Sequence, residues 1–376
     1  MQQHLLFDCL DSILSQTYPN IELIICDDCS ADFDEEAIRA YIDAHQGENL
    51  RRVVIHRSSR SVGTVQTAQT GVELSTGVYF KLLAGNDMLH APETLTQAAE
   101  LLSPPNVHIL AGRSLACQYD GTMTEHYYPS PEAMNCVRNA DAATQFDFLG
   151  TQAQQMYFHM PAVFFKRSVF DKIGGFDCRY EFVLDWSVLL KVTGAGYAVT
   201  TTDNVLATYR YGGRRNSGDA ADIPFHNQYY RECIRILKDY ALSRFEREGR
   251  KKKVFRCHHA IRCLENRIVA EDDWNSWTTG QKLVWRLKNL DFLLLSWLYK
   301  KRYQGIPMPN CRKPVCIMLV CILLYLFRVQ LLPWFAPEGM WAALFFITAL
   351  YLLFRVALSL AFYAMRVLLT LIGKRG

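Results

Sequence analysis

Carboxylates at the ends of apolar stretches are the side chains whose spacing in this sequence could support chemistry. Asp27 and Asp28 follow the β-favouring run at residues 21–26, and Asp87 follows a second such run at residues 78–83. In an open α/β sheet, the loops after the carboxyl ends of the strands are where ligands bind. Each aspartate also has a local interpretation, because turns use the same residue. The two loops are therefore candidates for one binding site.

Strand-like and helix-like stretches alternate along the chain, and these elements must position the two loops. Strands are predicted at residues 21–26, 53–55, 78–83, 107–111 and 162–165, and helices at residues 6–14, 38–45, 64–75 and 95–102. Alternation of this kind predicts an α/β fold of the Rossmann-like type, with a mostly parallel sheet and helices on both faces. A further helix is expected around Asp185, after a Gly-Gly turn.

Four stretches, in this order, carry a resemblance to a known family. They are LDSILSQTYPNIELIICDDCSAD (10–32), SVGTVQTAQTGVELSTGVYFKLLAGND (61–87), KIGGFDCRYEFVLDWSVLLKVTGAGY (172–197) and LATYRYGGRRNS (206–217). Over residues 4–217 the chain resembles the inverting family 2 nucleotide-sugar glycosyltransferases, which have a GT-A fold. The order and spacing of the stretches make the resemblance specific.

The resemblance implies a role for each acidic position. Asp28, with Asp27 and with Ser30 in the same loop, would bind the nucleotide-diphosphate sugar through its base, and Asp87 would lie beside the diphosphate. Asp185 would be the general base, which takes the proton from an acceptor hydroxyl as the oxygen attacks the anomeric carbon. The local alternatives stay open, since Asp27 or Asp28 could cap a turn and Asp185 could cap its helix.

The metal loop of the family falls on residues 84–87, which read AGND here, so one carboxylate is lost and a second is an amide. Mn²⁺ and Mg²⁺ favour oxygen ligands and share them with phosphates and water. We therefore expect a divalent cation on Asp87 and the carbonyl of Asn86. If no metal ion is bound there, Lys81 and Arg210 are the cations expected to neutralise the diphosphate. The family also opens with a strand that has no counterpart before the first helix, which would leave its neighbours with unpaired backbone groups.

Composition sets broad limits on the class of protein. The chain has 376 residues, half of them hydrophobic, which is enough for about two domains with a sizeable core. The formal net charge of +4 is small, and the basic clusters lie near the apolar tail, so nucleic acid is not an expected partner. Twelve cysteines with no recognisable signal peptide fit free thiols in a reducing compartment.

Three regions are expected. They are a glycosyltransferase domain at 1–221, a helical membrane-proximal extension at 222–313, and two transmembrane or membrane-embedded helices at 314–372. The apolar runs at 315–335 and 339–365 are each long enough to cross a hydrocarbon core of ~30 Å. Basic residues flank their outer ends, which predicts a membrane location with the catalytic domain in the cytoplasm. Because each run contains an arginine, helices lying in the membrane interface remain the alternative.

The predicted function is transfer of a sugar from a nucleotide-diphosphate donor to a hydroxyl of a surface-glycan or lipid-linked acceptor. The reaction would invert the anomeric carbon, with Asp185 as the base. The alternative is a catalytically weak or inactive glycosyltransferase-like subunit that binds or assembles at the membrane, because the metal loop is degenerate.

Overall fold

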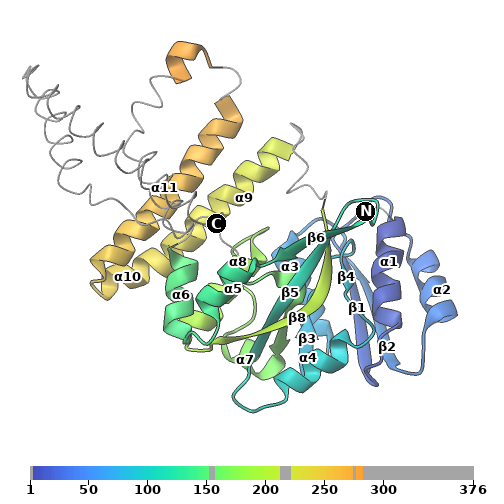
Figure 1. The fold of residues 1–376 in the computed structure, drawn as a ribbon. Helices are drawn as coiled ribbons and strands as arrows, with labels where there is room; N and C mark the ends of the chain where they lie inside the picture. The colour runs from blue at the N-terminus through green and yellow to red at the C-terminus, as the bar shows by residue number, and fades with distance from the viewer. Residues whose placement is uncertain (1–2, 152–156, 212–221, 274–276, 283–376) are drawn as a thin grey trace, which may run out of the picture. The chain divides into compact units, whose positions relative to one another are not determined.

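The computed structural model describes residues 3–151, 157–211, 222–273 and 277–282 (Figure 1). The helices are α1 (Gln3–Leu14), α2 (Glu35–His45), α3 (Thr64–Leu74), α4 (Thr94–Leu102), α5 (Pro131–Val137), α6 (Ala142–Gly150), α7 (Arg167–Lys172), α8 (Leu184–Gly194), α9 (Ile223–Ile236), α10 (Ser243–Arg247) and α11 (Lys251–Asp273). Two shorter elements are the 3₁₀ turn η1 (Met160–Ala162) and the π-helical turn η4 (Leu237–Leu242). The strands are β1 (Ile21–Asp27), β2 (Leu50–Arg57), β3 (Tyr79–Lys81), β4 (Met88–Leu89), β5 (Ile109–Cys117), β6 (Met123–Tyr128), β7 (Val163–Lys166) and β8 (Val199–Arg210).

The strands form two sheets. β1 and β2 make a parallel pair, and the larger sheet has the order β3-β7-β5-β8-β4, with β6 added to β5. The predicted alternation of strands and helices is confirmed. A mostly parallel sheet is wrong for the larger sheet, where only β5 and β8 run parallel and the other four pairings are antiparallel. β6 and β7 both run opposite to β5, and helices α5 and α6 connect them.

A cavity of about 580 Å³ is lined by both β1 and β3. In the part of the chain that the structure describes, β1 pairs only with β2 and β3 only with β7, so each has one edge without a neighbouring strand. Leu10 of α1, Ile24 of β1 and Phe80 of β3 are among the apolar side chains around the cavity.

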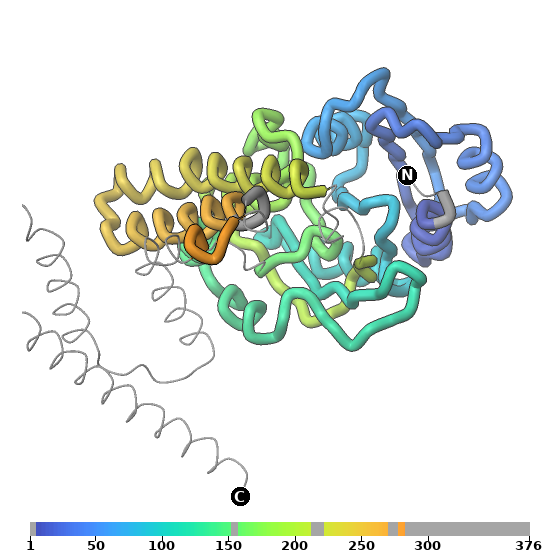
Figure 2. Tube along the Cα trace, turned by 90° about the horizontal axis from the view of Figure 1, so that it is seen from above, coloured from blue at the N-terminus to red at the C-terminus, as the bar shows by residue number. Residues whose placement is uncertain are grey.

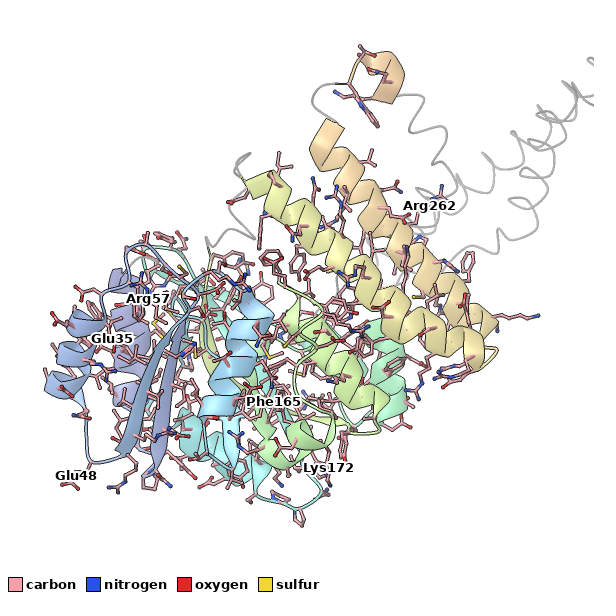
Figure 3. All side chains as sticks on the ribbon, turned by 180° about the vertical axis from the view of Figure 1, so that it is seen from behind. Glu35, Glu48, Arg57, Phe165, Lys172 and Arg262 are labelled. Carbon is pink, nitrogen blue, oxygen red and sulfur yellow. The ribbon has the colours of Figure 1, made fainter. Side chains whose placement is uncertain are left out.

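The main core lies between the larger sheet and the helices that follow it. Phe165 of β7, labelled in Figure 3, is fully buried in this core. The same core contains Leu237, Phe245 and Ile261, which come from the helical region after β8. Helices α9 and α11 of that region run side by side (Figure 2). The boundary at residue 221 stays a prediction, but the helices just beyond it share their packing with the sheet.

The expected membrane location has to be corrected. None of the helices in the described ranges combines the length and apolar character needed to cross a membrane. The hairpin expected at residues 314–372, on which the location depended, lies outside the described residues, as does the extension from residue 283 onward. The location in a membrane with a cytoplasmic catalytic domain is therefore withdrawn.

Candidate active site

Asp27 is the last residue of β1 and stands at the start of the loop that follows this strand. Its side chain is buried, and its Oδ2 accepts a hydrogen bond from the backbone N–H of Ser30 at 2.8 Å. Arg57, at the end of β2 (Figure 3), places its Nε 3.6 Å from the same Asp27 oxygen and donates to the carbonyl of Ser30 at 2.8 Å. Cys29 within the loop has a φ of 66°, a left-handed conformation that such contacts hold in place. Asp27 is thus placed as the residue that shapes the turn.

Asp28 faces a different partner, the loop that leads into α3. Its Oδ1 accepts the N–H of Val62 at 2.6 Å, and its Oδ2 accepts the N–H of Gly63 at 3.0 Å and the hydroxyl of Ser61 at 2.8 Å. Burial raises the pKa of Asp28, but these hydrogen bonds outweigh burial and hold the pKa below its usual value. Asp28 is therefore a charged carboxylate.

Asp87 and Arg210 are brought together in the structure. Asp87 is 2% exposed, and its Oδ1 accepts the backbone N–H of Arg210 at 3.0 Å. Burial raises the pKa of Asp87 to about 6, although Arg210 opposes the shift. The Arg210 guanidinium donates to the carbonyls of Asn86 (3.2 Å) and Tyr119 (3.0 Å) and to Oδ2 of Asp8 (2.7 Å). Arg210 therefore neutralises carboxylates of the protein itself.

The expected metal ligands do not fit a divalent ion in this arrangement. The carbonyl oxygen of Asn86 receives a hydrogen bond from the positive guanidinium of Arg210, whose charge repels a metal ion at the same oxygen. Asp87 would then be left as the single carboxylate ligand, with one of its oxygens already bonded. Within the described ranges, no group of three or more His, Cys, Asp and Glu side chains could hold a metal. The carbonyl of Asn86 and the carboxylate of Asp87 are therefore not arranged as a site for a divalent ion.

Lys81 and Asp27 line the same cavity, the one between β1 and β3. The Nζ of Lys81 donates to the carbonyl of Pro161 and lies 4.8 Å from the centre of the Phe164 ring. Burial lowers the pKa of Lys81 to about 7. The positive charge of Lys81 opposes the rise in the pKa of Asp87, the carboxylate expected beside the diphosphate. The role of Lys81 toward the diphosphate itself stays a prediction.

Asp185 lies in the first turn of α8, half-buried, where its Oδ1 accepts the backbone N–H of Trp186 at 2.8 Å. The segment just before α8 touches the start of α3, because the carbonyl of Glu181 accepts the N–H of Val65 at 3.1 Å. Glu181 also packs against Gly63, where an added Cβ would lie 2.4 Å from Glu181 Cγ. The loop bound by Asp28 and the loop that leads to Asp185 are therefore in direct contact.

No pattern in the sequence singled out Asp8 or Gly63. Asp8 comes from the polar side of α1 and binds Arg210, and an acidic residue on an amphipathic helix usually faces solvent without a partner. Gly63 has a φ of 88°, and its N–H is one of the Asp28 partners. Its place in the family-like stretch SVGT was visible in the sequence, but its contact with Glu181 was not.

Comparisons with known proteins show related sequences and a related fold. Residues 2–174 match the family model described as Glycosyl transferase family 2. A "PGL/p-HBAD biosynthesis glycosyltransferase" of Mycobacterium bovis is 26% identical over 215 residues, which cover 56% of this chain and 73% of that protein. "Glycosyltransferase GlyG" of Streptococcus pneumoniae is 32% identical over 97 residues, covering 25% of this chain and 31% of that protein.

A likeness in fold is seen with the crystal structure of S. aureus TarS 1-349. Its TM-score is 0.52 at 12% sequence identity, covering 82% of this chain and 81% of that chain. At this identity the likeness shows the fold alone. The family match contains the loops of Asp28 and Asp87, and the relatives are glycosyltransferases. The family expected from the sequence is confirmed for residues 2–174, which match glycosyltransferase family 2, and the fold is of the GT-A-like α/β type.

Proposed function

We propose that the chain transfers a sugar from a nucleotide-diphosphate donor to a hydroxyl of a surface-glycan or lipid-linked acceptor, with inversion. The observation that carries this proposal is the contact between two loops. One is bound by the charged Asp28 and the other leads to Asp185. A donor whose base meets Asp28 would therefore have its reacting end within reach of a second carboxylate.

Each residue has a defined part in the proposed reaction. Asp28, as an ionised carboxylate, accepts a hydrogen bond from the nucleotide base. Asp185, half-buried in the first turn of α8, accepts the proton of the acceptor hydroxyl. The hydroxyl oxygen then forms its bond to the anomeric carbon from the face opposite the diphosphate. The bond between that carbon and the diphosphate oxygen breaks, and the nucleoside diphosphate leaves with the electron pair.

The experiment that tests this proposal is Asp185→Asn, which keeps the shape of the side chain but cannot take a proton. We expect turnover to fall by roughly 10²- to 10⁴-fold, measured as nucleoside diphosphate released from a panel of UDP- and GDP-sugars. Calorimetry should show unchanged binding of the nucleoside diphosphate. Asp171→Asn, at an exposed position in α7, is the matched control and should keep wild-type turnover.

Retained turnover in Asp185→Asn would remove this residue from the role of base. Binding of nucleoside diphosphate by the wild-type chain without turnover of any donor would support the alternative, a weak or inactive binding subunit. Loss of both binding and turnover in Asp185→Asn would mean that Asp185 shapes the nucleotide site.

A further inference from the structure

A buried carboxylate of α9 holds the main chain that leads to Asp185. Glu232 is 5% exposed, and its Oε1 accepts the backbone N–H of Glu181 at 2.8 Å. Its Oε2 accepts the N–H groups of Phe182 and Val183 at 2.8 and 3.0 Å. Helix α8 begins at the next residue. One side chain thus fixes three consecutive peptide units directly before the helix that carries the proposed base.

The segment needs such a partner because its own side chains cannot provide one. Val183 is at the N-cap position of α8, where no side chain of the segment accepts a hydrogen bond from the first turn. Serine, threonine, aspartate or asparagine usually supply that bond. Glu232 binds the N–H groups on the approach to the helix, and its negative charge is favourable beside a helix N-terminus. Hydrogen bonds to an ionised acceptor are stronger than those between neutral groups.

A second residue of α9 contacts the same segment. Gln228 lies four residues before Glu232, which places both on one face of the helix. Its Nε2 donates to Oε2 of Glu181 at 3.0 Å, so the side chain and the main chain of Glu181 are both held from α9. Glu181 in turn touches Gly63 and the start of α3. Contacts therefore run from α9 through residues 181–183 to the loop of Asp28.

We propose that Glu232 is a positioning residue for transfer, which sets the place of Asp185 relative to the bound donor through residues 181–183. The inference rests on the proposed role of Asp185 as general base. Helix α9 lies beyond residues 2–174, the part that matches the family model. A general base must lie within hydrogen-bond reach of the proton that it takes, and a displacement of 1 Å can cost about 10²-fold in rate.

Amide hydrogen exchange tests the contact without reference to the reaction. Glu232→Gln keeps the length of the side chain, but its NH₂ group faces a main-chain N–H and can accept nothing. We expect exchange in residues 181–183 to become roughly tenfold faster, with exchange in the strands of the larger sheet unchanged. Glu246→Gln, at an exposed position in α10, is the matched control. Unchanged exchange in residues 181–183 would overturn the proposal, whatever the role of Asp185.

Kinetics on the full chain then test whether the contact acts through Asp185. Glu232→Gln should lower kcat by roughly 10- to 100-fold, with the donor KM and the nucleoside diphosphate Kd within about threefold of wild type. Glu232→Asp, which keeps the charge, should recover part of kcat. In the Asp185→Asn background, Glu232→Gln should cost no further activity, because the group that it positions is already inactive.

Three results would count against the proposal. An equal fall of kcat in both backgrounds would show that Glu232 acts independently of Asp185. Loss of nucleotide binding together with kcat would indicate a purely structural role, and so would a failure of both the Gln and the Asp variants to fold. If Asp185→Asn retains turnover, the general-base proposal fails, while the exchange experiment still decides whether Glu232 holds residues 181–183.

Discussion

A single methyl group at Gly63 should disturb both halves of the site. Gly63 has a φ of 88° and a ψ of 161°, a backbone conformation that is essentially restricted to glycine. A Cβ built there would lie 2.4 Å from Cγ of Glu181 and 3.0 Å from its carbonyl oxygen. The Gly63 N–H also donates to Asp28 at 3.0 Å. Gly63→Ala must therefore move the loop of Asp28, the segment before α8, or both.

The size of the effect follows from two contributions to the free energy of unfolding. The backbone conformation costs a residue with a side chain about 1–3 kcal/mol. Crowding against Glu181 adds about 1–3 kcal/mol, because a main-chain oxygen cannot rotate away as a side chain can. Gly121 has the same φ of 88°, but no atom lies within 4 Å of an added Cβ. Gly121→Ala should therefore show a backbone cost of about 1–2 kcal/mol without crowding.

Urea denaturation of the two variants separates these contributions. Gly63→Ala should lose about 3 kcal/mol, seen as a lower midpoint at an unchanged slope, and Gly121→Ala about half as much. Calorimetry should also show nucleoside diphosphate binding weakened roughly tenfold in Gly63→Ala and unchanged in Gly121→Ala, because only Gly63 is bonded to Asp28. Equal losses of stability in the two variants, or wild-type nucleotide binding in Gly63→Ala, would refute the reasoning.

Two further predictions concern ionic contacts. Arg210→Met removes a buried guanidinium that donates to three oxygen atoms and should cost about 3–5 kcal/mol in urea denaturation. Arg138→Met breaks an exposed pair and should cost less than about 1 kcal/mol, so similar losses in the two variants would contradict this. Burial raises the pKa of Asp177, but hydrogen bonds from Arg179 and Tyr240 lower it to about 2. The ionised Asp177 therefore contributes about 2 kcal/mol to the free energy of unfolding above about pH 5, and this contribution is lost as the pH falls toward 2. The loss of stability in Asp177→Asn should therefore halve by about pH 3. A loss that does not depend on pH would contradict the assignment.

The sequence was a good guide wherever local patterns decide the structure. The strands at residues 21–26 and 78–83 were expected from β-favouring runs, and the structure has β1 and β3 there. The pairing of strands was not predictable in the same way. Whether β7 runs parallel or antiparallel to β5 depends on the connection through residues 118–162, which includes a hairpin and two helices and carries no motif.

The site was predictable only in part, because sequence position does not tell which way a side chain points. Asp28 and Asp87 were identified because they follow strand ends. Both carboxylates accept backbone hydrogen bonds, Asp28 from Val62 and Asp87 from Arg210. Lys81, the last residue of β3, donates to the carbonyl of Pro161 beside the cavity, a contact that its place in the sequence does not indicate. Glu232 could not be found, because a glutamate in a charged helical stretch usually faces solvent.

The loop that leads to Asp185 depends on the helices after β8 at more than one point. Besides the bonds to Glu232, the hydroxyl of Tyr180 donates to Asp239 of η4 at 2.8 Å, and the hydroxyl of Tyr240 donates to Asp177 at 2.6 Å. These contacts lie along residues 177–183. Hydrogen bonds to both the side chains and the main chain of this loop must therefore break before the loop can move. A general base works only when its position is fixed before the acceptor arrives. The helices that pack into the sheet's core therefore also supply the rigidity that the proposed chemistry requires.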